Sequence, residues 1–307
     1  MSSVEDRVAG VLVGTAAGDA LGAGYEFATP PTGEVDMIGG GLGDFAPGEW
    51  TDDTAMAVAV AEVAATGVLD PPAIGERFLD WLRDGPADVG ISTRAVLASV
   101  ARGADLPAAA TAYLDAHPNS GAGNGALMRT APVALARLGD DAGIAEAARA
   151  VAELTHADPL AGDACVLWCI AIDRAVREER LDGIHDALPL LPATRRRDWA
   201  DRIAEAEQGP PARFTPNGFT VTALQAAHAA VVQTPVPGDE PTGHLVAALE
   251  AAVRIGDDTD TVTAIAGGLL GGRWGASAVP GRWRTMLHGW PGLDDDDLAD
   301  LAHRIVG

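Results

Sequence analysis

The chain has no lysine, and all 21 of its basic residues are arginine. This absence excludes a Schiff-base lysine and the lysine of a phosphate-binding P-loop from any site in the protein. Cysteine is nearly absent as well. The only two are Cys165 and Cys169, which lie four residues apart in a strongly apolar segment. Since a secreted disulfide scaffold carries more cysteines, we interpret this pair as small buried hydrophobic residues and not as a redox pair.

Aromatic residues are few, at 5% of the chain. Basic residues are also scarce relative to acidic ones, which gives the protein a net charge of −23. Such an acidic surface repels nucleic-acid backbones and anionic membranes, which argues against a general nucleic-acid binder but allows a local pocket for one modified nucleotide. Residues 1–7 lack the cationic start of a signal peptide, and the apolar runs fall short of the ~20 residues of a membrane span. We therefore expect a cytoplasmic protein with no membrane partner.

Alanine, the strongest helix former, is abundant in a chain that is 48% hydrophobic over 307 residues. No break in composition and no internal repeat divides the sequence. These features predict an all-α protein with one domain over residues 1–307, and residues 181–218 have the least certain pattern. The expected helices cover 54–67, 71–82, 132–138, 142–154, 160–178, 219–231, 245–254 and 262–270, with two more that follow a cap at Ser92 or Thr93 and start near Asp105.

Four glycines recur every four residues in the first apolar segment, at Gly10, Gly14, Gly18 and Gly22. At helical pitch they form one stripe without side chains. Because glycine costs a helix up to ~1 kcal/mol per position relative to alanine, this stripe needs a packing reason. We expect a second helix to pack closely over it.

Two acidic motifs lie about two hundred residues apart, each just before an apolar helical run. They are Thr51-Asp52-Asp53-Thr54 and Gly256-Asp257-Asp258-Thr259-Asp260-Thr261. One such motif alone is typical of a helix cap, but carboxylate and hydroxyl oxygens are also the ligands of Mg²⁺, Mn²⁺ and Ca²⁺. The repeated pattern therefore predicts one shared metal site. The four acids at 294–297 indicate instead a surface helix N-terminus, which the helix macrodipole favours.

Two connecting segments carry the remaining candidate groups. The loop Asn119-Ser120-Gly121-Ala122-Gly123-Asn124-Gly125 has three glycines in five residues, which lets backbone N–H groups approach a phosphate. The alternative is a mobile linker. The segment Thr155-His156-Ala157-Asp158-Pro159 places a histidine next to a helix start. A lone histidine in such a connection is usually structural, and a ligand-binding role is the alternative.

Five motifs follow one another along the chain: Gly18-Asp19-x-x-Gly22-x-x-x-Glu26, Thr51-Asp52-Asp53-Thr54, Gly123-Asn124-Gly125-x-x-Met128-Arg129, Thr155-His156-x-Asp158-Pro159 and Gly256-Asp257-Asp258-Thr259-Asp260-Thr261. In this order they resemble the ADP-ribosylglycohydrolase family, which includes the dinitrogenase-reductase-activating glycohydrolase and the ADP-ribosyl-acceptor hydrolases. The resemblance covers about residues 5–275. It implies an all-α, single-domain orthogonal helical bundle with two Mg²⁺ or Mn²⁺ ions in a central cleft.

The resemblance also implies a role for each matched residue. The metal ligands would be Thr51, Asp52, Asp53, Asp258, Asp260 and Thr261. Proton transfer would fall to Glu26, Asp52 or Asp53, with the choice open, and Asp257 would cap or support the site. Asp88 resembles a loop carboxylate that contacts substrate in the bacterial nitrogenase-regulating members. The diphosphate and proximal ribose would contact Gly121, Gly123, Asn124, Gly125, Met128 and His156.

The implied activity is hydrolysis of the C1″–N or C1″–O bond between ADP-ribose and a modified acceptor, with ADP-ribosyl-arginine on protein as first choice and ADP-ribose as product. Serine-linked ADP-ribose, O-acetyl-ADP-ribose and ADP-ribosylated nucleobases are alternative substrates. A two-metal nucleotide phosphoesterase uses the same kind of cation site and is a second hypothesis. A non-catalytic ADP-ribose-binding module is a third.

Overall fold

The computed structural model describes residues 2–118 and 121–307. In this part of the chain the fold is helical apart from the two-residue strands β1 (His288–Gly289) and β2 (Leu293–Asp294), which pair antiparallel. The predicted all-helical, single-domain fold is confirmed. The α-helices are α1 (Val4–Gly22), α2 (Asp52–Ala64), α3 (Pro71–Arg83), α4 (Ile91–Ala98), α5 (Leu106–Ala116), α6 (Ala131–Ala136), α7 (Asp141–Ala152), α8 (Pro159–Glu178), α9 (Ala193–Gln208), α10 (Thr220–Gln233), α11 (Gly243–Val253), α12 (Thr259–Trp274), α13 (Gly281–Arg284) and α14 (Asp295–Val306).

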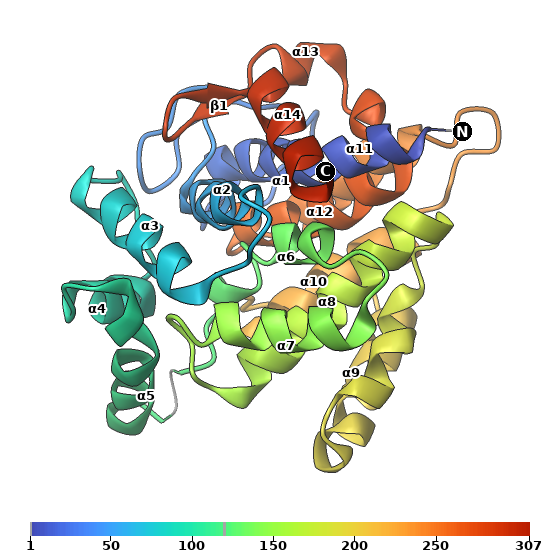
Figure 1. Cartoon of the computed structure of the whole chain (residues 1–307). Coiled ribbons are helices and arrows are strands. Elements are labelled where there is room, and N and C mark those ends of the chain that lie inside the picture. Colours follow the sequence, from blue (N-terminus) through green and yellow to red (C-terminus); the bar gives the residue numbers. More distant parts are fainter. Residues whose placement is uncertain (1, 119–120) are drawn as a thin grey trace.

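The arrangement of these helices places the two acidic motifs near each other. Helices α3, α4 and α5 form one side of the molecule, and α9 projects from the opposite side (Figure 1). Between them, α1 packs along α12, and α2 lies close to both. Because α2 and α12 each begin at an acidic motif, this packing brings both motifs to one region.

The predicted glycine stripe is the contact surface between α1 and α12. A Cβ atom added at Gly14 would lie 2.3 Å from the backbone oxygen of Gly267, and one added at Gly267 would lie 2.0 Å from the backbone oxygen of Gly14. No real Cβ atom tolerates such a distance, so the two backbones touch because neither helix carries a side chain there. The expectation of close packing over the stripe is confirmed.

Gly18→Ala is expected to destabilise the protein by about 1–3 kcal/mol, the usual cost of overpacking. The new Cβ would lie 2.0 Å from the backbone oxygen of Thr263, and this clash outweighs the ~1 kcal/mol that alanine gains in helix propensity. Urea unfolding measures the loss. Gly281→Ala is the matched control, because nothing lies within 4 Å of a Cβ there. Equal stability of the two variants would contradict the close-packing interpretation.

Several helix boundaries differ from the prediction. Helix α4 begins at Ile91 with Gly90 as its N-cap, so neither Ser92 nor Thr93 caps it. The chain turns into the helix directly from its glycine, which leaves both hydroxyls inside the first turn.

Two later segments also bear on the predictions. Within residues 181–218, where the sequence pattern was least certain, a 3₁₀ segment (Gly183–Leu190) precedes α9. The acids at 294–297 behave as predicted, since Asp294 and Asp297 form a capping box at the start of α14.

One other expectation was wrong. By length and composition alone, the helix Val4–Tyr25 is apolar enough to cross a membrane, although 94% of its apolar window is buried inside the fold.

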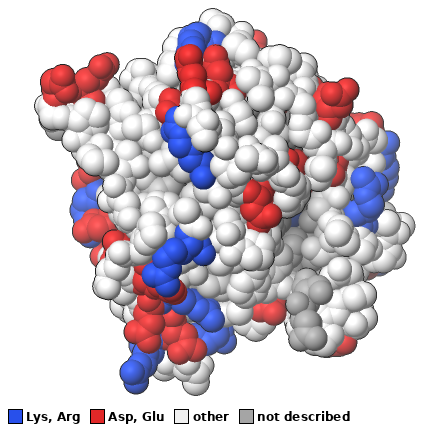
Figure 2. All heavy atoms as spheres, turned by 180° about the vertical axis from the view of Figure 1, so that it is seen from behind, with Lys and Arg blue, Asp and Glu red and all other residues white. Residues whose placement is uncertain are grey.

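Helix α9 is tied to α8 by a partly buried ion pair. Arg195 pairs with the buried carboxylate of Asp163, which also accepts a hydrogen bond from Trp199 at 3.2 Å. Elsewhere acidic and basic groups alternate on the surface, as on the projecting lower part of Figure 2 where α9 lies.

Candidate active site

A cavity of about 470 Å³ lies where the two acidic motifs meet. Asp52 and Asp53 enter it from the start of α2, and Asp258, Asp260 and Thr261 from the start of α12. The motifs also touch directly, because the hydroxyl of Thr261 donates to Oδ2 of Asp53 at 3.4 Å. Residues separated by about two hundred positions therefore share one site.

A buried carboxylate on α1 holds the first motif in place. Asp19 is fully buried and accepts hydrogen bonds from the backbone N–H of Thr51 at 3.0 Å, from the N–H of Thr54 at 2.9 Å and from its hydroxyl at 2.6 Å. Thr51 itself caps α2, and its hydroxyl bonds the carboxylate of Asp53 at 3.2 Å instead of lining the cavity. Asp19 thus fixes the start of α2, a role the sequence did not assign to it.

Two asparagines hold the second motif. The amide of Asn124 donates to Oδ2 of Asp258 at 2.8 Å. Asn217, which is fully buried, accepts from the backbone N–H of Asp258 at 2.9 Å and donates its own backbone N–H to Asp257 at 2.7 Å. Asp257 therefore points away from the cavity, as its expected supporting role requires. Asn217 gave no signal in the sequence, because its partners lie 40 and 41 residues away.

Burial and mutual repulsion raise the pKa values of the clustered carboxyls. Burial, followed by the charge of Asp88, raises the pKa of Asp52 to about 8. Burial, followed by the charge of Asp258, raises the pKa of Glu26 to about 7. The pKa values of Asp53 and Asp260 also lie well above the ordinary range, with burial as the first cause in each. Without a counter-charge, the site would retain protons near neutral pH.

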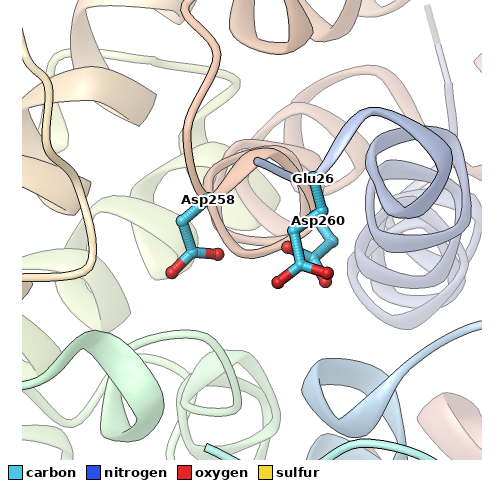
Figure 3. A group of neighbouring side chains, drawn as sticks. All are labelled: Glu26, Asp258 and Asp260. Carbon is cyan, nitrogen blue, oxygen red and sulfur yellow. The ribbon is translucent and has the colours of Figure 1, made fainter. Parts of the chain in front are cut away.

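The donor set fits a hard cation. Carboxylate oxygens of Glu26, Asp258 and Asp260 all lie within 4.8 Å of one another, and Figure 3 shows the three side chains directed into the same space at the start of α12. One oxygen of Asp53, Oδ1, is buried with no hydrogen-bond partner. A buried anionic oxygen without a donor is costly unless a cation faces it. The all-oxygen set suits Mg²⁺ or Mn²⁺.

The opposite wall comes from the predicted loop and its neighbours. Asp88, Gly123, Asn124, Gly125, Met128 and His156 all line the cavity. Gly121 does not, and it lines an adjoining pocket of about 500 Å³ together with Phe219 and Leu160. Gly123 lines both pockets, and the assignment of Gly121 to substrate binding stays a prediction. Asn119 and Ser120 lie outside the described residues.

The sequence analysis missed nine further lining residues, which are Phe27, Leu42, Val89, Gly90, Ile91, Ser92, Thr93, Tyr113 and Gly218. Ser92 and Thr93 reach the cavity because α4 starts earlier than predicted, and Phe27, Leu42 and Tyr113 add apolar surface. The hydroxyl of Ser92 lies 3.3 Å from Nε2 of His156, although the two residues are 64 positions apart. Helix periodicity could have placed Ser92 only if the start of α4 had been known.

Together, these features define an all-helical protein with a cavity whose carboxylates fit a divalent cation. The chain belongs to the ADP-ribosylglycohydrolase family, whose model matches residues 1–307. It is 32% identical over 298 residues to the ADP-ribosyl-(dinitrogen reductase) glycohydrolase of Rhodospirillum rubrum, a match that covers 93% of this chain and 91% of that protein. It is 30% identical to the ADP-ribosylarginine hydrolase Tri1 of Pseudomonas putida, covering 91% and 73%.

A solved structure described as an ADP-ribosylglycohydrolase-related protein complex shares the fold, with a TM-score of 0.76 and 29% identity. The match covers 100% of this chain and 99% of that one. The recognised family and the all-helical fold are thus established for this chain.

Proposed function

We propose that this protein is a divalent-cation-dependent hydrolase that cleaves the glycosidic bond between ADP-ribose and a modified acceptor, with ADP-ribosyl-arginine on protein as the preferred substrate. The observation that carries the proposal is the convergence of both acidic motifs on one cavity that also contains the Gly123–Gly125 loop. The choice of arginine is supported by the name of the Pseudomonas putida relative, an ADP-ribosylarginine hydrolase.

The cation site would be formed by Asp52, Asp53, Asp258, Asp260 and Glu26, with Thr261 and Thr51 supporting Asp53 through their hydroxyls. A bound Mg²⁺ or Mn²⁺ would neutralise these carboxylates and supply a Lewis acid for the hydroxyls of the distal ribose and a water.

Proton transfer and contact with the acceptor would fall to side chains of the protein. Cleavage at C1″ passes through an oxocarbenium-like state and needs a carboxylate that receives a proton from the attacking water. Glu26 is one candidate, because its carboxylate accepts a single long hydrogen bond, from the N–H of Leu42 at 3.4 Å, and Asp52 is held in a similar way by the N–H of Gly90 at 3.3 Å. Asp52 and Asp53 are the other two candidates. Asp88 lies at the cavity wall, where a cationic arginine acceptor would find a negative partner.

A turnover panel tests the proposal. The protein is incubated with arginine-, serine- and guanine-linked ADP-ribose, first with Mg²⁺ and then with Mn²⁺, and the products are separated by chromatography. We expect release of intact ADP-ribose, fastest from the arginine conjugate, and at least a 100-fold loss after exhaustive chelation, restored by added cation. Release of AMP would instead establish a pyrophosphate cut. Full activity without cation, or tight ADP-ribose binding with no turnover, would overturn the proposal.

A further inference from the structure

A chain of hydrogen bonds between polar side chains ends at the cavity, where His156 and Ser92 are lining residues. Nη2 of Arg129 donates to the hydroxyl of Thr155 at 2.8 Å, and the same hydroxyl lies 2.8 Å from Nδ1 of His156. The other ring nitrogen of His156, Nε2, lies 3.3 Å from the hydroxyl of Ser92. Arg129, Thr155 and His156 are buried, whereas Ser92 is only partly buried. This chain of hydrogen bonds links two loops to helix α4, and the proposed cation site does not use it.

Arg129 forms the rigid end of this chain. Its guanidinium lies 4.6 Å from the centre of the Phe78 ring, and it donates to the backbone oxygen of Gly125 at 3.1 Å and of Val151 at 3.3 Å. A guanidinium has only donors, so the oxygen of Thr155 must act as the acceptor in their contact. The direction of the first hydrogen bond is therefore fixed by chemistry.

The hydroxyl of Thr155 then has one hydrogen to donate. Among the described residues, Arg129 and His156 are its two hydrogen-bond partners. If Nδ1 of His156 also donated to this oxygen, the buried hydroxyl hydrogen would have no acceptor, which costs about 1–3 kcal/mol. The arrangement that satisfies all three groups has the hydroxyl donating to Nδ1. The hydrogen of the neutral imidazole must then be on Nε2.

The protonation state agrees with this assignment. Burial, followed by the nearby charge of Arg129, lowers the pKa of His156 to about 3, so the ring is neutral over the physiological range. A neutral histidine with Nδ1 occupied is a hydrogen-bond donor at Nε2 and cannot act as a general base there.

We propose that Thr155 is a positioning residue that fixes His156 with its hydrogen on Nε2, so that the imidazole donates to the hydroxyl of Ser92 and leaves the serine hydrogen to donate to an anionic phosphoryl oxygen of the ligand. Nε2–H points to the hydroxyl of Ser92, and this leaves the serine hydrogen directed into the cavity that both residues line. The ligand half of this inference rests on the proposed function, whereas the tautomer does not.

The adjoining loop is shaped to leave the hydroxyl of Ser92 accessible. A Cβ atom at Gly123 would lie 3.2 Å from Nε2 of His156 and 3.5 Å from the hydroxyl of Ser92. One at Gly125 would lie 3.0 Å from Cε1 of the same ring. Side chains at these two positions would crowd the imidazole, so the glycines keep the space beside its N–H open. An oxygen acceptor that enters this corner would also meet the backbone of the loop.

The tautomer is measured directly in the ligand-free protein. Protein labelled with ¹⁵N-histidine gives long-range ¹H–¹⁵N spectra that distinguish a hydrogen on Nδ1 from one on Nε2, and a His156→Gln variant assigns the signals. We expect the Nε2–H form alone in the wild type, unchanged from pH 5 to pH 8. In Thr155→Val the Nδ1 signal should shift as it loses its donor, and in Thr155→Ser it should return. A hydrogen on Nδ1 in the wild type would overturn the proposal.

Binding and kinetics test the ligand half. Titration calorimetry with ADP-ribose is expected to give about tenfold weaker binding for Thr155→Val and near wild-type binding for Thr155→Ser, since a hydrogen bond to a charged group is lost in the first and kept in the second. KM should rise with little change in kcat, because the contact is the same before and during bond cleavage. If Thr155→Val fails to fold, Ser92→Ala, which is expected to weaken binding about fivefold, takes its place.

The outcomes separate the two levels of inference. Unchanged ADP-ribose affinity in both Thr155→Val and Ser92→Ala would overturn the role of Ser92 as donor even if the enzyme hydrolyses ADP-ribosyl-arginine. A wild-type protein that binds no ADP-ribose would overturn the proposed function and the role of Ser92 together, and the tautomer would still be decided by the ligand-free spectra.

Discussion

Asp260→Asn is expected to lower turnover of ADP-ribosyl-arginine by more than about 100-fold, while the metal-free variant becomes more stable than the wild type. Loss of a group that only supports a metal ligand typically costs 10–100-fold, so loss of a ligand should cost more. Asp260 is buried, and repulsion from Asp53 and Asp258 adds to burial in raising its pKa well above the usual range. A neutral amide removes that repulsion and keeps the acceptor that Oδ1 offers to the N–H of Thr261 at 2.9 Å.

The opposite signs of the two effects make the prediction specific. Turnover and Mn²⁺ affinity are measured with cation present. Urea unfolding is measured in EDTA at pH 8, where we expect a gain in the free energy of unfolding of at least about 1.4 kcal/mol, the value of one pKa unit. Asp257→Asn is the matched control, since Asp257 faces Asn217 outside the cavity and asparagine keeps an acceptor. A variant that loses stability along with activity would indicate a structural role for Asp260 and contradict the cation site.

The parts of the fold that the sequence predicts are those with a local cause. The glycine stripe needs only helical pitch, and the acidic motifs need only their place at helix starts. Residues 181–218 lacked such a pattern because their stability comes from distant partners. Arg195 in α9, for example, pairs with Asp163 in α8, 32 residues earlier, and the sequence alone gives no sign of this pair.

The candidate site shows the same difference between features with a local cause and features that depend on distant residues. Family motifs located the carboxylates, but the groups that orient them are joined to them only by the fold. Asp19 reaches Thr54 across 35 residues and Asn217 reaches Asp258 across 41. The sequence likewise does not show that Gly121 lines the adjoining pocket, because a glycine-rich composition indicates a backbone free to approach a ligand but not which of its peptides faces the cavity.

The stability of the metal-free protein is expected to fall as pH rises from 6.5 to 8.5, and added Mg²⁺ should reverse this loss. Burial raises the pKa of Asp52 to about 8 and that of Glu26 to about 7 in the folded state. In the unfolded chain both titrate near their ordinary values, so in this range the folded state binds more protons. Each such carboxyl lowers the free energy of unfolding by up to ~1.4 kcal/mol per pH unit until pH passes its folded-state pKa.

Between pH 6.5 and 8.5, the change of stability with pH reports on the acidic cluster. The buried His156, whose pKa is about 3, opposes the trend only below the ordinary histidine pKa of 6.5. Glu207, with its pKa lowered to about 2 by a hydrogen bond from His228, stays ionised throughout the window in both states. The measurement is urea unfolding at pH 6.5, 7.5 and 8.5, in EDTA or in Mg²⁺, with NaCl matched for ionic strength.

A cation that binds only the folded protein stabilises it by an amount that grows with its affinity, and protons on the same carboxylates compete with it. The gap between the two unfolding curves should therefore widen as pH rises, to a few kcal/mol at pH 8.5. In Asp260→Asn the gap should shrink, because one ligand is gone and fewer protons are displaced. Parallel curves with and without Mg²⁺ would mean that the cation does not bind where these carboxyls titrate, and the convergence of the two acidic motifs would then need another explanation.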